Sequence, residues 1–298
     1  MKILGFIVLC FIWGTTWLAI KFSLEGLPPF FGATLRFTVA AILLLTYVLL
    51  KKISLRVSRK EFGIIAISAF LIYTLDYGLI YWGEQYLDAG VTAIFFSTFV
   101  LFTSIWSNFV FRNETFRWNK FIGLLIGFIG ILIVFFDQLI LTRFDHLVML
   151  ASLGIVIGAA GGAMASVIIK KHLSKMNPFT LTLNQLALGI LFLSLMCLGF
   201  ENTHTIHLNL HIICAVLYLG ILGSAFAFVL YYRLLQTMSA ITLALIVYIT
   251  PVIAVITDFL VYGEIISLNS IVGMCIIFLG IGLSQKRIKT ASLIRQSS

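Results

Sequence analysis

Ten long apolar runs are the feature of this sequence that most constrains its fold. A helix that crosses a bilayer needs about 20 mostly apolar residues. The sequence contains ten such runs, at 3–22, 29–50, 62–83, 90–111, 120–137, 147–169, 178–200, 211–232, 240–262 and 269–285. Only 10% of the residues are charged, whereas a soluble domain carries roughly 25%, and the mean hydropathy is +1.12. The alternating pattern of a transmembrane β-barrel is absent. We therefore predict an all-α polytopic membrane protein with ten transmembrane helices.

Basic residues gather on one side of the predicted membrane. With a cytoplasmic N-terminus, all but three of the 20 Lys and Arg residues fall in cytoplasmic loops and tails. The exceptions are Lys21 and Arg143 on the outer side and Arg36 within a helix. Because cytoplasmic loops of membrane proteins are enriched in Lys and Arg, we predict an inner (plasma) membrane protein with both termini in the cytoplasm. The same distribution explains the net charge of +9 without a nucleic-acid partner. The first run has no small-residue cleavage site after it, so we expect a retained helix rather than a signal peptide.

The two halves of the sequence resemble each other. Shifts of 149 and then 150 residues align pairs that include Lys21 with Lys170, Pro29 with Pro178, Tyr81 with Tyr231, Gly123 with Gly273 and Gly130 with Gly280. Each half holds five helices, so the second half enters the membrane from the opposite side. We predict a first repeat at 1–140, an inverted second repeat at 141–285 and a basic cytoplasmic tail at 286–298. Inverted repeats are common in secondary transporters, where substrate binds between the halves near the midplane.

Several motifs resemble the EamA family of the drug/metabolite transporter superfamily. They are the opening "FIWGTTWLAIKF", the arginine in "PPFFGATLRF", and a Glu…Gly…Gly pattern in each half, at Glu114, Gly123 and Gly130 and at Glu264, Gly273 and Gly280. One departure is Leu101, where family members often have a proline that matches Pro251. The resemblance implies a ten-helix carrier. Most such proteins export amino acids and other small metabolites, and some import nucleotide-like or vitamin-like compounds.

Two ionisable residues fall inside predicted helices. An Arg or Asp at the centre of a spanning helix costs roughly 2.5–3.5 kcal/mol on insertion scales. Arg36 and Asp76 both lie about 10 Å below the predicted outer surface, at 1.5 Å per residue. We expect them to face each other or to share a wet cavity, and three interpretations stay open: a structural ion pair, direct contact with substrate, or no mutual contact. Gln185 aligns with Arg36, an asymmetry that suits a solute with one anionic end, such as an amino-acid carboxylate.

Aromatic residues form a second candidate group. Trp13 and Trp17 are four residues apart and share a helix face, Tyr77 lies beside Asp76, and Tyr248 is deep in the ninth run. We expect these aromatic side chains to line a cavity. Tyr81 lies nearer a helix end, where we expect it in the interfacial aromatic belt.

The repeat also predicts an uneven pocket. Gly162 aligns with Trp13 and Ser166 aligns with Trp17. If these faces of the first and sixth helices meet, they enclose a pocket with one bulky wall and one thin wall. Ordinary close packing of small residues is the alternative interpretation.

Glycine and proline positions predict packing and bending. Small residues recur every three or four positions in "GLLIGFIG" (123–130), which lets helix backbones approach closely. We expect helix 5 (120–137) to pack against helix 10 (269–285), with a possible homodimer through the same helices. Pro251 removes a backbone hydrogen bond, so we expect it to bend the ninth helix and to act as a hinge.

Catalytic and metal-binding motifs are missing from the sequence. It contains no H-E-x-x-H, G-x-S-x-G or Walker A pattern, which argues against an enzyme, a cofactor and a self-contained ATP-driven pump. We interpret His204, His207 and His211 as hydrated loop residues rather than a zinc site. The four cysteines lie in or beside apolar runs, where small packing residues are expected.

These observations predict a secondary transporter that works by alternating access. The expected cargo is a small polar metabolite, with export of amino acids or related compounds as the leading interpretation. An uptake permease for a nucleotide-like or vitamin-like compound is one alternative, and a lipid-modifying membrane enzyme or a scaffold is another. Helices 1, 3, 4, 6, 8 and 9 are expected to line the path. The predicted substrate-binding residues are Trp13, Trp17, Arg36, Asp76, Tyr77, Gln185 and Tyr248.

Overall fold

The computed structural model describes residues 2–111, 118–202, 206–262 and 267–285. The sequence predictions for Glu114, His204, Glu264 and the tail at 286–298 lie outside these residues.

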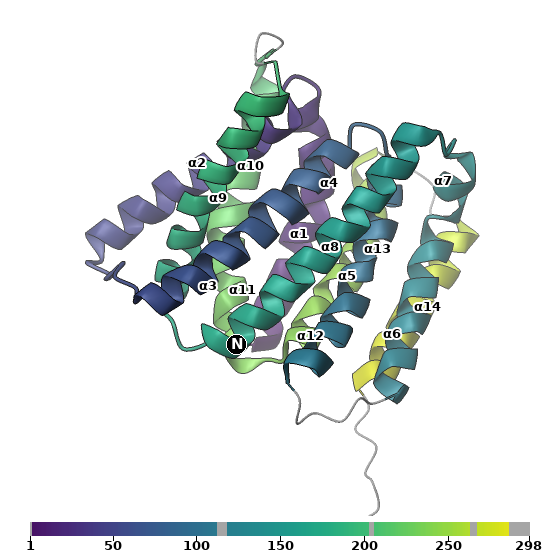
Figure 1. The fold of residues 1–298 in the computed structure, drawn as a ribbon. Helices are drawn as coiled ribbons and strands as arrows, with labels where there is room; N and C mark the ends of the chain where they lie inside the picture. Colours follow the sequence, from purple (N-terminus) through teal and green to yellow (C-terminus); the bar gives the residue numbers. More distant parts are fainter. Residues whose placement is uncertain (1, 112–117, 203–205, 263–266, 286–298) are drawn as a thin grey trace, which may run out of the picture.

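The described residues form helices and short connections, with no strand (Figure 1). Nine helices in this part of the chain are long and apolar enough to cross a membrane, and the apolar α6 is slightly shorter. The crossings are α1 (Lys2–Leu24), α2 (Pro29–Leu50), α3 with η1 and α4 (Arg59–Ala69, Phe70–Tyr77, Gly78–Gly83), α5 (Ala89–Val110), α6 (Trp118–Val134), α8 (His146–His172), α9 (Pro178–Phe200), α10 with η3 and α11 (Leu210–Gly220, Ile221–Phe226, Ala227–Thr237), α12 with α13 (Ala240–Ala244, Ile246–Tyr262) and α14 (Leu268–Gln285). A short α7 (Phe136–Leu141) follows α6. The prediction of an all-α polytopic membrane protein is confirmed.

Local sequence signals explain where several helices begin. Pro29 and Pro178 occupy the first turns of α2 and α9, where a missing N–H is tolerated. Ser58 and Glu61 form a capping box at the start of α3, which satisfies backbone donors that have no partner within the helix. An unusual cap joins distant parts of the chain, because the Glu201 carboxylate accepts hydrogen bonds from the first backbone N–H groups of α2, at 2.5 Å and 2.8 Å.

Helices from the two halves of the chain interleave in matched pairs. α6 packs along α14, and α2 packs along α9. α5 packs on α8, while the aligned helix of the second half, α13, packs on α1. In Figure 1 the α6 and α14 pair stands at one edge of the bundle.

Glycines let α6 and α14 approach at backbone distance. A Cβ at Gly123 would lie 2.5 Å from the backbone nitrogen of Ser284, and one at Gly130 would lie 2.7 Å from that of Ile277. A Cβ at Gly280 would collide with the backbone of Gly127. The prediction that helix 5 packs against helix 10 is confirmed, and the spacing of small residues is its physical cause.

Two crossings contain a π-helical segment at aligned positions. η1 (Phe70–Tyr77) lies in the third crossing and η3 (Ile221–Phe226) in the eighth. A shift of 150 residues places 70–77 on 220–227. A π-helical turn leaves a carbonyl free for other donors and is frequent at functional sites. η1 lines the cavity described below, and the Gly223 carbonyl of η3 accepts a hydrogen bond from Trp13, which also lines it.

Pro251 lies inside α13, and the helix accommodates it. A proline removes the hydrogen bond to the carbonyl four residues earlier, which belongs to Val247. The Thr250 hydroxyl donates to that oxygen instead, at 3.1 Å. The ninth crossing is interrupted at Leu245, between α12 and α13. A hinge role for Pro251 stays a prediction.

Candidate functional site

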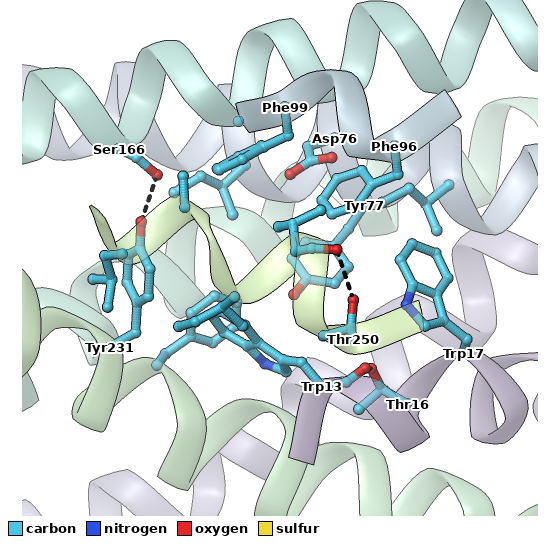
Figure 2. Close-up of a pocket in the computed structure, with 18 of the residues that line it drawn as sticks. Trp13, Thr16, Trp17, Asp76, Tyr77, Phe96, Phe99, Ser166, Tyr231 and Thr250 are labelled. Atoms are coloured by element: carbon cyan, nitrogen blue, oxygen red, sulfur yellow. Dashed lines mark hydrogen bonds between the residues drawn. The ribbon is translucent and has the colours of Figure 1, made fainter. Parts of the chain in front are cut away.

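A central cavity of about 90 Å³ lies inside the bundle (Figure 2). Its walls come from α1, from η1 and α4, from α5, α8 and α11, and from α12 and α13. These elements are the first, third, fourth, sixth, eighth and ninth crossings, the same six that the sequence predicts around the transport path. The volume accommodates several water molecules, at roughly 10–15 Å³ each.

The two walls of the cavity differ in bulk as the alignment of the halves predicts. Trp13 and Trp17 of α1 line it together with Gly162 and Ser166 of α8. The Trp13 ring packs 5.4 Å from that of Tyr231, whose hydroxyl donates to Ser166 Oγ at 3.0 Å. The faces of α1 and α8 therefore meet at one cavity, with large side chains on one and small ones on the other.

Asp76 brings a carboxyl group to this cavity from η1. Its side chain is 5% exposed, and Oδ1 has no hydrogen-bond partner among the described residues. Gly162 makes room for it, because a Cβ at that position would collide with Oδ2. Figure 2 shows Asp76 and Tyr77 on one side of the cavity and Trp13 on the other.

Arg36 is buried beside the cavity but does not line it. Its Nε donates to Ser224 Oγ at 2.8 Å and its Nη2 to the Gly223 carbonyl at 3.2 Å, both in η3. The guanidinium carbon lies 4.9 Å from the centre of the Tyr77 ring, a cation–π distance. No ion pair joins Arg36 to Asp76 among the described residues, so the interpretation of a direct salt bridge is wrong.

Two further predicted site residues make contacts away from this cavity. Gln185 donates through Nε2 to Ser68 Oγ at 2.7 Å and is fully buried. Tyr248 is also fully buried and donates to the carbonyl of Leu124 in α6 at 2.9 Å. In this structure Tyr248 anchors the ninth crossing to the fifth. A direct role of either side chain with substrate stays a prediction.

Sequence reasoning missed a buried carboxyl at the end of α4. Glu84 is 6% exposed, and neither of its oxygens has a hydrogen-bond partner. Tyr81, one turn earlier, is fully buried and interacts electrostatically with Arg36. The expectation that Tyr81 lies in the interfacial belt is therefore wrong. Tyr77, Tyr81 and Glu84 share one helix face, but the place of Glu84 at a helix end gave no signal of its burial.

Aromatic residues contributed by α5 and α11 were also missed. They complete the cavity wall and are Phe96, Phe99, Phe228, Tyr231 and Tyr232. The alignment of Tyr231 with Tyr81 marks one of them, whereas phenylalanines in apolar runs give no signal of their own.

A second cavity, of about 340 Å³, lies toward the end of the bundle that holds Lys21, here called the Lys21 end. Trp17 lines both cavities and so stands between them. Pro251 lines the second cavity. At its rim Lys21 forms an exposed ion pair with Asp88, at 3.0 Å.

The opposite end, here called the Lys170 end, is tied by hydrogen bonds between crossings. Lys170 Nζ donates to the carbonyls of Leu235 and Gln236 at the end of α11, at 2.6 Å and 3.3 Å. Lys171 Nζ donates to the Val110 carbonyl at the end of α5, at 3.0 Å. Lys21 and Lys170 are aligned residues of the two halves, yet they have different partners.

The loop histidines make local contacts. The His207 backbone N–H donates to the Gly26 carbonyl at 2.9 Å, and the His211 ring packs 4.2 Å from that of Phe22. The described part of the chain has no group of three His, Cys, Asp or Glu residues placed to hold a metal ion.

Comparisons with known proteins agree on the class of protein. The model of the EamA-like transporter family matches residues 1–136 and 149–284. The chain is 25% identical over 278 residues to the uncharacterized transporter YoaV of Bacillus subtilis, covering 93% of this chain and 94% of the relative. It is 26% identical over 279 residues to Protein PagO of Salmonella typhimurium, covering 94% and 91%.

A third relative is also a transporter by name, and a solved structure shares the fold. An uncharacterized transporter of Archaeoglobus fulgidus is 27% identical over 274 residues, covering 90% of this chain and 93% of the relative. A solved crystal structure matches with a TM-score of 0.80 at 17% identity, covering 95% of this chain and 96% of that chain. At this identity the match demonstrates a shared fold and carries no information on cargo.

Proposed function

The chain belongs to the EamA-like transporter family and is a multi-pass membrane transporter rather than an enzyme, and we propose that it carries small polar metabolites by alternating access. The proposed direction is export, with amino acids or related compounds as the cargo class. We place it in the inner membrane with both termini in the cytoplasm, as the distribution of basic residues favours. The Lys21 end then faces outward and the Lys170 end faces the cytoplasm.

The observation that carries this proposal is the central cavity between the crossings of the two halves. The first, third and fourth crossings of one half and the sixth, eighth and ninth of the other surround it. Transporters built from inverted repeats place substrate at such an interface, and movement of one half against the other exposes it to each side in turn. The matched helix pairs support an inverted repeat of 1–140 and 141–285.

The contacts at the two ends support one state of such a cycle. The wider cavity lies toward the Lys21 end, whereas Lys170 and Lys171 bridge crossings at the other end. We infer that the structure corresponds to a state closed toward the cytoplasm, with Trp17 separating the outer vestibule from the central cavity.

Solute flux in liposomes that contain only this protein tests the proposal. Radiolabelled amino acids, amines, nucleotides and vitamins are each loaded inside, and their exit is followed against empty liposomes. Ser166→Trp places a second tryptophan opposite Trp17, so that it fills the central cavity. We expect this variant to lose at least nine-tenths of the flux while its elution profile stays unchanged.

Leu195→Trp is the matched control, because Leu195 is 58% exposed on the outer face of α9. We expect it to transport like the unmodified protein. Absence of flux for every solute class would overturn the transport proposal. Equal flux in both tryptophan variants would overturn the central cavity as the path.

A homodimer through helices 5 and 10 stays a prediction. Exposed apolar side chains on the outward faces of α6 and α14 include Ile122, Ile129, Phe278 and Leu279. Lipid chains cover such residues as well as a second copy does, so measurement of mass in detergent decides the question.

A further inference from the structure

Three side chains that ordinarily carry charge are buried among the described residues. Arg36 is 1% exposed, Asp76 is 5% exposed and Glu84 is 6% exposed. No two of them form an ion pair, since the ion pair found in this part of the chain joins Lys21 to Asp88. A buried charge is costly unless a counter-charge or hydrogen bonds compensate it. We therefore ask which charged groups lie near each of the two buried carboxyls.

Two cations interact with Glu84. The Glu84 carboxyl interacts electrostatically with the ammonium of Lys21 and with the guanidinium of Arg36. Nη1 of Arg36 and both oxygens of Glu84 lack hydrogen-bond partners among the described residues. Because a guanidinium stays charged in proteins, Arg36 supplies a positive charge in the field of Glu84.

Asp76 is left without a counter-charge. The groups that interact electrostatically with its carboxyl are the phenols of Tyr77, on its own helix, and Tyr231, on α11. Arg36 of α2 lies behind the Tyr77 ring, and α11 also presents Tyr232 to the cavity. The remaining elements around the cavity face it with uncharged side chains, which include Trp13, Trp17, Phe96, Phe99, Gly162 and Thr250.

We propose that Asp76 is the recognition site for a positively charged group of the cargo, and that among amino acids and related compounds the protein selects those of net positive charge, such as basic amino acids and amines, over neutral zwitterions and anions. This inference rests on the proposed transport function. The aromatic rings around the carboxyl favour a cation, because ring faces attract positive charge. A cargo carboxylate finds no cationic partner among the described residues that line this cavity, since Arg36 is bound to η3 outside it.

In the proposed cycle the Asp76 carboxyl, which is buried without a counter-charge among the described residues, carries a proton when no cargo is bound. When a cation enters, the O–H bond of the carboxyl breaks, the proton passes to water, and the carboxylate becomes the counter-ion of the cargo. Binding therefore releases about one proton per cation. The apparent affinity falls about tenfold for each unit of pH below the value at which the carboxyl titrates, because proton and cation compete for one site.

Calorimetric titration of the purified protein with three aromatic probes tests this. Phenyltrimethylammonium is a permanent cation, so any released proton comes from the protein. Phenylalanine is the zwitterion of similar size, and phenylacetate is the anion. Titrations in two buffers of different ionisation enthalpy give the affinity and the number of protons released. We expect the cation to bind at least tenfold more tightly than either other probe, with proton release.

Three variants assign the effect to Asp76. Asp76→Asn keeps the shape and removes the charge, and we expect loss of proton release and at least a tenfold loss of cation affinity. Asp76→Glu keeps the charge, so proton release should remain although affinity falls. Glu25→Gln removes an exposed acid at the Lys21 end and should bind like the unmodified protein.

Several results would overturn cation selection. They are phenylalanine or phenylacetate binding as tightly as the cation, unchanged cation affinity in Asp76→Asn, or no binding of the cation by a protein that transports other solutes. Each of these leaves the transport proposal intact if liposome flux is present. Absence of flux for every solute class overturns the transport function itself, so the two failures are distinguishable.

Discussion

The two halves of the molecule share a backbone plan and differ in the side chains that meet at the cavity. Trp13 of the first half corresponds to Gly162 of the second, and both line the cavity. Asp76 lines it as well, whereas its counterpart, Phe226, is half exposed on the outer face of its helix. The difference teaches that the two halves share a framework without sharing their cavity chemistry. On the proposed function, the carboxyl group that recognises a solute comes from one half.

Where the halves are alike, the shared residues serve the framework. The glycines of α6 and α14 allow the same close approach from both sides, and the two π-helical segments occupy aligned positions. Two kinds of variant therefore test recognition and framework separately. One kind replaces a residue with the different residue found at the aligned position, and the other kind disturbs a residue that both halves share.

Arg36→Gln gives the first half the residue that the second half has at the aligned position, Gln185. We expect the largest loss of stability here, about 3–5 kcal/mol, because the variant removes a buried charge that donates to η3 and interacts with Glu84. The midpoint of thermal unfolding in detergent measures it. Arg36→Lys keeps the charge and should lose less. Equal midpoints for Arg36→Gln and the unmodified protein would contradict a stabilising role of the buried Arg36 charge.

Gly280→Ala disturbs a framework position. Its Cβ would collide with the backbone of Gly127, so we expect a loss of about 1–3 kcal/mol from overpacking, again read from thermal unfolding. Gly282→Ala on the same helix is the control, because nothing lies within 4 Å of its Cβ. Equal unfolding midpoints for Gly280→Ala and Gly282→Ala would contradict the framework role of the shared glycines.

Gly162→Ala thickens the thin wall of the cavity. The added methyl group would displace the Asp76 carboxyl, and we expect the affinity for phenyltrimethylammonium to fall about tenfold, equivalent to about 1.4 kcal/mol. Calorimetry measures this. Gly154→Ala on the same helix should bind normally, since its Cβ would lie 3.6 Å from the nearest atoms. A normal affinity in Gly162→Ala would contradict the placement of the carboxyl against α8.

Lys170→Met and Lys21→Met compare aligned lysines at the two ends. Lys170 donates to two helix-end carbonyls, so its loss should cost about 1 kcal/mol. Lys21 forms an exposed ion pair, which is usually worth less than about 1 kcal/mol. We expect the smaller shift in unfolding midpoint for Lys21→Met. The reverse order would show that the Lys21 end is the more firmly held.

Most of the fold was predictable because its determinants are local. Apolar runs set the crossings, and the glycine spacing in 123–130 predicted the contact of α6 with α14. Four predicted site residues, Trp13, Trp17, Asp76 and Tyr77, reach the cavity. Their positions followed from helix faces and from the alignment of the halves.

The rest depends on information that a helical pattern does not contain. Arg36 turns to η3 because a π-helical segment presents the Gly223 carbonyl to it, and sequence periodicity does not reveal such a segment. Glu84 lies at a helix end in the sequence, where exposure is the ordinary expectation. Its burial results from packing of α4 against other crossings.

The cap at the start of α2 has a consequence for biosynthesis. Glu201, which receives the first N–H groups of α2, is made about 170 residues after them. Until the seventh crossing has left the ribosome, the beginning of the second depends on water or lipid headgroups for these bonds. The start of α2 thus reaches its final form only after the seventh crossing is synthesised, so a chain truncated before Glu201 is expected to leave this junction open to proteolysis.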